Sequence, residues 1–195
     1  PEALDYVDVY DRAGGLSPRA VLAHAVHLSD RELDRMVASG SRVAHCPISN
    51  LFLASGVMPL GRYVEAGLSV GLGSDVAAGP DLSLFSVMRV GFYSQNALRV
   101  AGVGGPVLGP LDWLAMATLG GARALGLGDV IGSVEVGKEA DLIAVDPRFA
   151  APLEDQPPDD DAADLASRLI FRSHPDMVRA AWVRGHALAG PARRG

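Results

Sequence analysis

The chain has 195 residues and carries 17 Lys and Arg against 23 Asp and Glu, which gives a formal net charge of −6. Hydrophobic residues make up 49%, which excludes disorder of the whole chain, and the acidic balance argues against a nucleic-acid-binding module. The single cysteine, Cys46, cannot form an internal disulfide. No apolar run approaches the ~18 residues of a membrane helix, and residues 1–20 lack the charge order of a signal peptide. These features predict a cytoplasmic, globular α/β chain of one or two domains.

The first two thirds of the chain alternate strand and helix signals. Residues 20–26 form a nearly continuous apolar run, as expected of a strand covered on both faces. Ser29 and Glu32 have the spacing of a capping box that starts a helix, which Gly40 ends. Further signals predict a strand at 42–46, a loop through Ser49 to Gly56, a helix at about 58–66, a strand at 68–73, a helix at about 82–99 capped by Asp81, and a helix at about 111–125.

Three strand–helix units in succession predict a parallel sheet, either open or closed into a barrel. A complete (β/α)₈ barrel needs roughly 200–250 residues, so this region can supply only part of one. After Gly128 the pattern changes to short strand signals separated by turns, at 130–136, 141–145 and 180–187. We therefore predict two units, 1–128 and 129–195. The second is part of a small β domain with an acidic loop from Glu154 to Asp164 and a short helix at about 162–171.

Each of the three predicted parallel strands ends near a residue that can bind a metal or move a proton. These residues are His24, His45 and Asp75. Because ligands and catalytic groups gather at the C-terminal ends of parallel strands, the three together predict a site. Each also has an ordinary alternative: a lone buried histidine is more often a hydrogen-bonded core residue than a ligand, and an aspartate after a strand often caps the next helix. Spacing alone does not fix the reaction.

Several familiar catalytic motifs are absent or incomplete. The sequence has neither the HExxH motif of zinc peptidases nor the Pro-Cys-x-x-Cys motif of cytidine deaminases. Gly71-Leu72-Gly73 lacks the third glycine of a dinucleotide-binding fingerprint. Consecutive positions on one strand place the side chains of His45 and Cys46 on opposite faces, so Cys46 is predicted to be packed and inert rather than a nucleophile. The remaining histidines are predicted to be surface or structural residues: His27, His174 and His186.

Several sequence blocks, taken together and in order, resemble guanine deaminases of the amidohydrolase superfamily. The Gly137-Lys138 block is common to many amidohydrolases, whereas His-Cys-Pro-x-Ser-Asn-Leu, starting at His45, narrows the resemblance to the guanine deaminase branch. The opening segment 5–10 is also similar to that branch. The blocks cover nearly the whole chain: Leu22–Asp30, Ala44–Leu53, Gly71–Val76, Ala117–Ala122 and Gly132–Asp141.

The resemblance implies an α/β fold in which a distorted (β/α)₈ TIM-like barrel holds one Zn²⁺ at the C-terminal ends of its strands, with a small β-sandwich beside it. In that family a His-x-His pair on the first strand, a His on the fifth and an Asp on the eighth bind the metal. By motif, Asp75 corresponds to the metal-binding aspartate, which also accepts a proton from the attacking water. His24 corresponds to the sixth-strand histidine that orients this water. His45 falls in the seventh-strand block and is assigned support of the pocket, without a metal role.

The sequence also departs from the family pattern. It has no His-x-His, and no second strand-terminal His followed by a Glu precedes His24. It therefore resembles only the C-terminal portion of the enzyme, about strands 6–8 and part of the sandwich, with an unpaired edge where the fifth strand would lie. The resemblance implies hydrolysis of guanine to xanthine and ammonia by a homodimeric enzyme of purine catabolism when complete, with this chain alone inactive. The alternatives are a non-catalytic binding or scaffold module, and an amidohydrolase for another aminated heterocycle.

Overall fold

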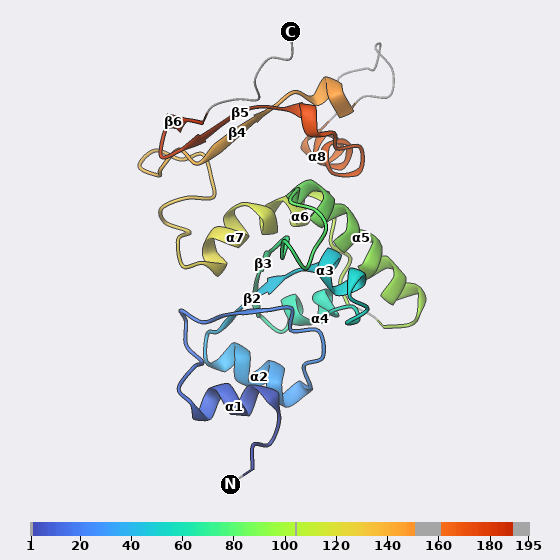
Figure 1. Cartoon of the computed structure of the whole chain (residues 1–195), viewed down its shortest axis with the longest axis vertical. Helices are drawn as coiled ribbons and strands as arrows, with labels where there is room; N and C mark the ends of the chain where they lie inside the picture. The colour runs from blue at the N-terminus through green and yellow to red at the C-terminus, as the bar shows by residue number, and fades with distance from the viewer. Residues whose placement is uncertain (1, 104, 151–160, 189–195) are drawn as a thin grey trace.

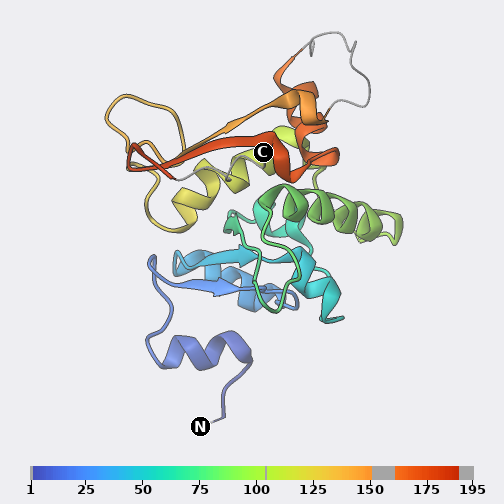
Figure 2. The same ribbon diagram turned by 45° about the horizontal axis from the view of Figure 1, so that its top comes forward.

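The computed structural model describes residues 2–103, 105–150 and 161–188, which form a mixed α/β molecule with two three-stranded sheets (Figures 1 and 2). The first sheet is parallel throughout, with β2 in the centre, which confirms the predicted parallel pairing: β1 (Val21–Ala23), β2 (Arg42–His45) and β3 (Ser69–Leu72). The second sheet is antiparallel: β4 (Leu142–Val145), β5 (Val178–Val183) and β6 (His186–Ala187).

Eight α-helices occur in the described ranges, and several of them connect and cover the parallel strands. In Figure 1 the antiparallel sheet lies at one end of the molecule, α1 lies at the other, and α6 and α7 lie between the two sheets. No helix in these ranges is both long and apolar enough to span a membrane. The helices are α1 (Tyr6–Arg12), α2 (Asp30–Ala38), α3 (Pro47–Phe52), α4 (Leu60–Glu65), α5 (Leu84–Val100), α6 (Pro110–Ala117), α7 (Leu119–Ala124) and α8 (Ala162–Phe171), with 3₁₀ turns η1 (Pro147–Ala150) and η2 (Pro175–Met177).

The predicted capping box at the start of α2 is confirmed. The hydroxyl of Ser29 accepts from the backbone N–H of Glu32 at 3.3 Å, and the Glu32 carboxylate accepts from the Ser29 N–H at 2.9 Å. The apolar face of α2 buries Leu33 and Met36. Gly40 follows in the left-handed region, at φ +67°, which glycine adopts without a Cβ clash. Local sequence therefore fixes both ends of this helix.

Two expectations for the region around the strand ends are wrong. Residues 47–52 form α3 instead of the predicted loop, because Pro47 sits in the first turn, where its fixed φ favours a helix start. β1 is not covered on both faces: Val21 is 41% exposed and Ala23 is also exposed. The reason is that, among the described elements, β1 packs closely only against β2, and no helix is packed closely over its side chains.

The helix boundaries after β3 also differ from the sequence prediction. Ser83, not Asp81, is the N-cap of α5, while the Asp81 carboxylate accepts from the Ser83 N–H at 2.8 Å. The helix expected at 111–125 breaks at Thr118 into α6 and α7. The Thr118 hydroxyl donates to the Leu114 carbonyl at 2.8 Å. The two glycines that follow let α7 lie close to β3: a Cβ on Gly71 would be 3.1 Å from the Gly121 Cα.

Three further differences from the sequence prediction occur, two in the C-terminal third and one at the N-terminal end. Residues 130–136 form turns instead of a strand, and Val134 and Val136 are exposed without a neighbouring strand to cover them. The strand expected at 180–187 is a hairpin whose turn is formed by Arg184 and Gly185, both at positive φ. The N-terminal helix α1, capped by Asp5, had no predicted counterpart. Most of the predicted acidic loop lies outside the described residues.

The hydrophobic core lies around β2 and is closed by helices on either side. Its largest fully buried side chains include Trp113 and Tyr63. Gly91 allows α5 to approach Trp113 on α6, since a Cβ at this position would lie 2.4 Å from the indole ring. This core places the ends of the three parallel strands on a rigid base.

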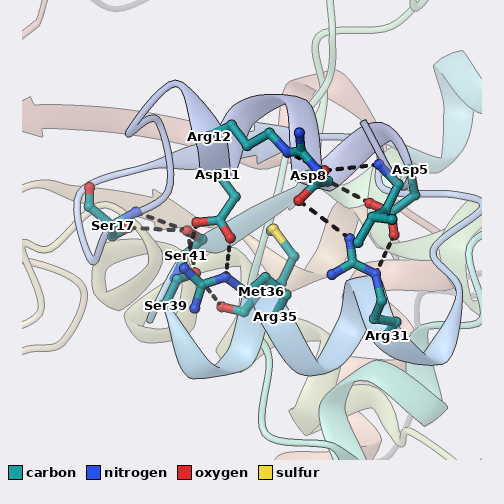
Figure 3. A network of polar contacts seen from close by, with 11 residues as sticks. Asp5, Asp8, Asp11, Arg12, Ser17, Arg31, Arg35, Met36, Ser39 and Ser41 are labelled. Atoms are coloured by element: carbon teal, nitrogen blue, oxygen red, sulfur yellow. Dashed lines mark hydrogen bonds and ion pairs between the residues drawn. The ribbon is translucent and has the colours of Figure 1, made fainter. Parts of the chain in front are cut away.

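Helices α1 and α2 are joined by a set of charged side chains that we name the helix-pair cluster (Figure 3). The Arg31 Nε donates to Asp5 at 2.7 Å, and Arg35 forms a two-point ion pair with Asp11. The pKa of the Asp11 carboxyl lies below its ordinary value, first through its hydrogen bond with Arg35. These contacts dock α1 on α2. The cluster consists of Asp5, Asp8, Asp11, Arg12, Arg31 and Arg35.

Candidate active site

His24 and Asp75, the two residues expected to carry the chemistry, both have unusual backbone conformations. His24 directly follows β1 and has φ +70°, and Asp75 lies just after β3 with φ +52°. Ala25 also lies in this left-handed region, at φ +48°. Non-glycine residues held in sparsely populated conformations cost on the order of 1–3 kcal/mol each and cluster at functional sites. The strain supports a functional role for both positions.

The two side chains meet although their strands are not neighbours. β2 lies between β1 and β3, and the His24 Nε2 is 3.7 Å from the Asp75 Oδ2 across its end. This distance is too long for a direct hydrogen bond. The side chains are 41% and 31% exposed, so both groups remain open to solvent. The predicted convergence of an imidazole and a carboxylate at the strand ends therefore exists.

Two residues of the His-Cys-Pro-x-Ser-Asn-Leu block, to which the sequence analysis assigned no role, contact this pair. The Asn50 Oδ1 is 2.8 Å from the His24 Nδ1, and the Ser49 hydroxyl donates to the Asp75 Oδ2 at 2.5 Å. Both residues lie in α3, where Ser49 is fully buried and Asn50 is 2% exposed. Pro47 is the signal that could have found them. A helix starting there, directly after β2, brings its first turn to the ends of all three strands.

The loop that carries His24 is fixed by two further contacts. The His27 Nε2 lies 2.8 Å from the Ser55 carbonyl oxygen, and the Tyr63 hydroxyl accepts from the Leu28 N–H at 3.1 Å. His27 thus contacts the backbone of a neighbouring loop, as expected of a structural residue. These anchors keep the β1–α2 connection, and with it His24, in place.

The donor set of the site is only part of what a catalytic metal needs. A catalytic zinc site uses about three protein ligands and keeps one position open. In residues 2–103, 105–150 and 161–188, no three His, Cys, Asp or Glu side chains lie close enough together to hold a metal ion. Asp75 offers one carboxylate, beside the imidazole of His24. The described residues therefore supply a partial site.

Comparison with known proteins places this arrangement in a family. The model of the amidohydrolase family matches residues 2–188. The chain belongs to the amidohydrolase family. A probable guanine deaminase of Deinococcus radiodurans is 42% identical over 153 residues, which are 78% of this chain and 34% of that protein. A 5-methylthioadenosine/S-adenosylhomocysteine deaminase of Desulforudis audaxviator is 46% identical over 132 residues, 66% of this chain and 30% of that protein. The chain spans about a third of the length of these relatives.

Solved amidohydrolase structures share the fold of this chain. Guanine deaminase from C. acetobutylicum, with guanine bound in its active site, matches with a TM-score of 0.82 at 29% identity. The match covers 95% of this chain and 43% of the deaminase chain. An adenosine deaminase from Xanthomonas campestris, with bound zinc, matches with a TM-score of 0.76 at 37% identity. The match covers 91% of this chain and 38% of the deaminase chain. The amidohydrolase fold of guanine deaminases is therefore present here.

His45 is a buried part of this amidohydrolase and does not face the open site. It is fully buried, its ring centroid lies 6.4 Å from that of Trp113, and neither ring nitrogen has a hydrogen-bond partner in the described part of the chain. Burial, and then the charge of His24, lower the pKa of His45 to about 3. The ring is therefore neutral at neutral pH. Its assigned support of the pocket stays a prediction.

Cys46 has the properties of a packed, unreactive thiol. It is buried, and its Sγ lies 3.5 Å from the Ala44 carbonyl. Burial, and then the negative charge of Asp75, raise the pKa of the thiol to about 11. Since the thiolate is the nucleophilic form, this environment argues against covalent catalysis by Cys46.

One cavity lies beside the site. It has a volume of about 470 Å³, and its walls include His24, Ser49, Leu22 and Met36. A second cavity, of about 800 Å³, has Arg42 and Lys138 in its walls and lies toward the opposite ends of the strands, because Arg42 begins β2. We assign the smaller cavity to the site because it contains His24.

Proposed function

We propose that this chain is the C-terminal part of a zinc-dependent guanine deaminase and contributes His24 and Asp75 to its active site. The observation that carries the proposal is the meeting of these two side chains, both on strained backbone, at the C-terminal ends of parallel strands. Residues 1–128 then form about strands 6–8 of a (β/α)₈ barrel, and the antiparallel sheet belongs to a small β-sandwich. The remaining strands lie outside this chain.

In the proposed reaction, water adds to C2 of guanine and the bond from C2 to the amino nitrogen then breaks, which yields xanthine and ammonia. Asp75 accepts a proton from the attacking water as general base. The His24 Nε2 forms a hydrogen bond with the same water and fixes its direction. A residue outside this chain delivers the proton with which ammonia leaves.

The donors of this chain fit one part of the proposed metal site. Asp75 would be one zinc ligand, and further ligands would come from outside the chain. When bound, zinc lowers the pKa of water from 15.7 to about 7. The complete enzyme would act as a cytoplasmic homodimer on a free purine.

A second substrate class has its own support. The Desulforudis relative, at 46% identity over 132 residues, is named a 5-methylthioadenosine/S-adenosylhomocysteine deaminase, a name that specifies adenosine derivatives and not guanine. The runner-up proposal is therefore an amidohydrolase for another aminated heterocycle. A non-catalytic binding or scaffold module is the remaining alternative.

The test restores the missing part of the enzyme. The Deinococcus guanine deaminase segment that precedes its match to this chain is fused to residue 1, and ammonia release from guanine, 5-methylthioadenosine and S-adenosylhomocysteine is measured in the presence of zinc. Turnover of guanine that Asp75→Asn abolishes supports the proposal. Turnover of an adenosine derivative alone supports the runner-up, and no turnover by a folded chimera supports the non-catalytic alternative.

Zinc binding by the isolated chain provides an independent test. Calorimetric titration is expected to show no tight binding, since the described residues offer too few donors. Tight 1:1 binding that depends on Asp75 would contradict the proposed division of the metal site between two segments.

A further inference from the structure

The first turn of α3 reaches both reactive groups with two consecutive side chains. Ser49 contacts Asp75 at 2.5 Å and Asn50 contacts His24 at 2.8 Å. Both are polar side chains buried almost completely, so each needs a specific partner to offset its lost hydration. Their partners here are the two groups that we place in the chemistry. Two such contacts from adjacent residues make α3 a single support for the site.

The contact from Asn50 selects the tautomer of His24. An amide oxygen only accepts, so with Oδ1 facing the ring, the His24 Nδ1 must carry the proton. The neutral ring then has an unprotonated Nε2, and this is the nitrogen that lies 3.7 Å from Asp75. In this state Nε2 can accept a hydrogen bond from a water between the two groups. The opposite amide orientation would reverse the tautomer and turn Nε2 into a donor.

The contact from Ser49 selects the orientation of the Asp75 carboxylate. Its hydroxyl donates to Oδ2, and hydrogen bonds to a charged acceptor are about twice as strong as neutral ones. The other oxygen, Oδ1, has no hydrogen-bond partner within residues 2–103, 105–150 and 161–188. One carboxylate oxygen is thus fixed by α3 and the other is left available. The geometry of a ligand or base would depend on this division.

The support itself is rigid. Pro47 fixes the start of α3, and Ile48 anchors the same turn in the interior. The backbone N–H of Asn50 donates to the Cys46 carbonyl at 3.0 Å, which ties the turn to the end of β2. Ser49 and Asn50 therefore have little freedom to follow movements of His24 or Asp75.

We propose that Ser49 and Asn50 are positioning residues of this amidohydrolase: Asn50 holds His24 in the tautomer protonated on Nδ1, and Ser49 holds one oxygen of the Asp75 carboxylate. Neither residue reacts. The effect on turnover rests on the function proposed above, whereas the tautomer and the carboxylate orientation are properties of this chain alone.

The first experiment reads the tautomer without catalysis. The histidine side chains of the full 195-residue chain are labelled with ¹⁵N, and the nitrogen shifts of His24 are recorded at a pH where the ring is neutral, with His24→Gln used to assign the signal. We expect the Nδ1–H form in the unchanged chain and in Asn50→Asp, which keeps an acceptor. Asn50→Leu is expected to lose the preference for this form. The matched control is Asn96→Leu on α5, because the hydrogen bonds that hold His24 and Asp75 come from Asn50 and Ser49 and not from Asn96.

The same spectra can overturn the proposal. An Nε2–H ring in the unchanged chain would do so, as would an unchanged tautomer in a folded Asn50→Leu variant. Thermal unfolding of each variant checks that the fold persists. Should Asn50→Leu not fold, the Asn50→Asp variant and the unchanged chain still decide the tautomer.

The second experiment measures turnover in the chimera described above. Loss of a supporting hydrogen bond to a metal-site residue typically costs 10–100-fold, so Asn50→Leu and Ser49→Ala are each expected to lower kcat by about this factor with little change in KM. Ser49→Thr and Asn50→Asp, which keep the donor and the acceptor, should recover most of it. Unchanged kcat in Ser49→Ala would overturn the role of Ser49. An inactive chimera with the expected tautomer would count against the proposed function and not against this inference.

Discussion

The helix-pair cluster and the candidate active site are both polar networks, yet they are built in opposite ways. In the helix-pair cluster the arginine side chains are long and 42–46% exposed, and each carboxylate is matched by a cation. In the active site, buried short side chains of α3 support two partly exposed groups that are not directly bonded to one another. In the first network each carboxylate is paired with an arginine, whereas in the second the facing atoms of His24 and Asp75 stay open to solvent.

The backbone shows the same difference. Residues of the helix-pair cluster lie in α1, α2 and their caps, where the helix conformation is relaxed. His24 and Asp75 lie at positive φ, which the rest of the fold must enforce. The helix-pair cluster thus docks α1 on α2, whereas at the strand ends strained backbone brings the side chains of His24 and Asp75 together.

The largest expected effect comes from Asp75→Asn in the chimeric enzyme. Removal of a general base typically costs 10²–10⁴-fold, so kcat should fall by about this factor. Asparagine tolerates the left-handed region well, so the melting temperature should not fall. The measurement is ammonia release together with thermal unfolding, and Asp34→Asn, an exposed change on α2, is the control. Equal loss of activity in both variants would contradict a specific role of Asp75.

The pH dependence of stability tests the interior beneath the site. The pKa of His45 is lowered to about 3 by burial, below the ordinary value near 6.5, so the unfolded chain binds the proton more readily. The stability that the neutral His45 ring contributes to the fold is therefore fully present above about pH 6.5. As the pH falls from about 6.5 toward 3, the free energy of unfolding decreases by up to about 1.4 kcal/mol per pH unit. Denaturant unfolding between pH 7 and 5 should show this loss, and His45→Leu should reduce it. If the free energy of unfolding changed with pH equally in the unchanged chain and in His45→Leu, this would contradict a buried, neutral His45.

A smaller effect is expected at the start of α2. Ser29→Ala removes the hydroxyl of the capping box and should lower the free energy of unfolding by about 1 kcal/mol. For a chain of this size that corresponds to a fall in melting temperature of about 2–4 °C. Ser29→Asp, which retains a capping oxygen, should stay close to the original stability. If the melting temperature of Ser29→Ala equals that of the unchanged chain, the capping box does not define the start of α2.

The smallest effect is expected from the helix-pair cluster. Asp11→Asn breaks the ion pair with Arg35 and should lower the melting temperature slightly at low salt, with the difference vanishing at high salt. The pKa of Asp11 is lower in the folded than in the unfolded chain. The stability that its charged form contributes is therefore present above about pH 4 and is lost as the pH falls through the pKa of the folded state. A difference that persists in 1 M salt or at pH 2 would show that packing, not charge, holds α1.

Much of the parallel half could be predicted from the chain because the signals are local. The capping box at Ser29, the glycine after α2 and the three apolar strands each depend on a few neighbouring residues. His24 and Asp75 could be predicted as a set because parallel strands end on one side of a sheet. Expectations at 130–136 and for the faces of β1 were wrong, since a strand pattern does not reveal whether a covering partner is present.

By itself the sequence determined which residues end the parallel strands, where α2 begins, and the family resemblance that the family match then confirmed. Only the tertiary structure decided that Ser49 and Asn50 reach these strand ends, that His45 is enclosed, and that α6 and α7 are separate helices. The physical reason is the separation along the chain of the residues that interact. Caps and strand periodicity arise between residues close in the chain, whereas the contacts of Ser49 and Asn50 each join residues 26 positions apart and exist only once the core has fixed the strands and α3 together.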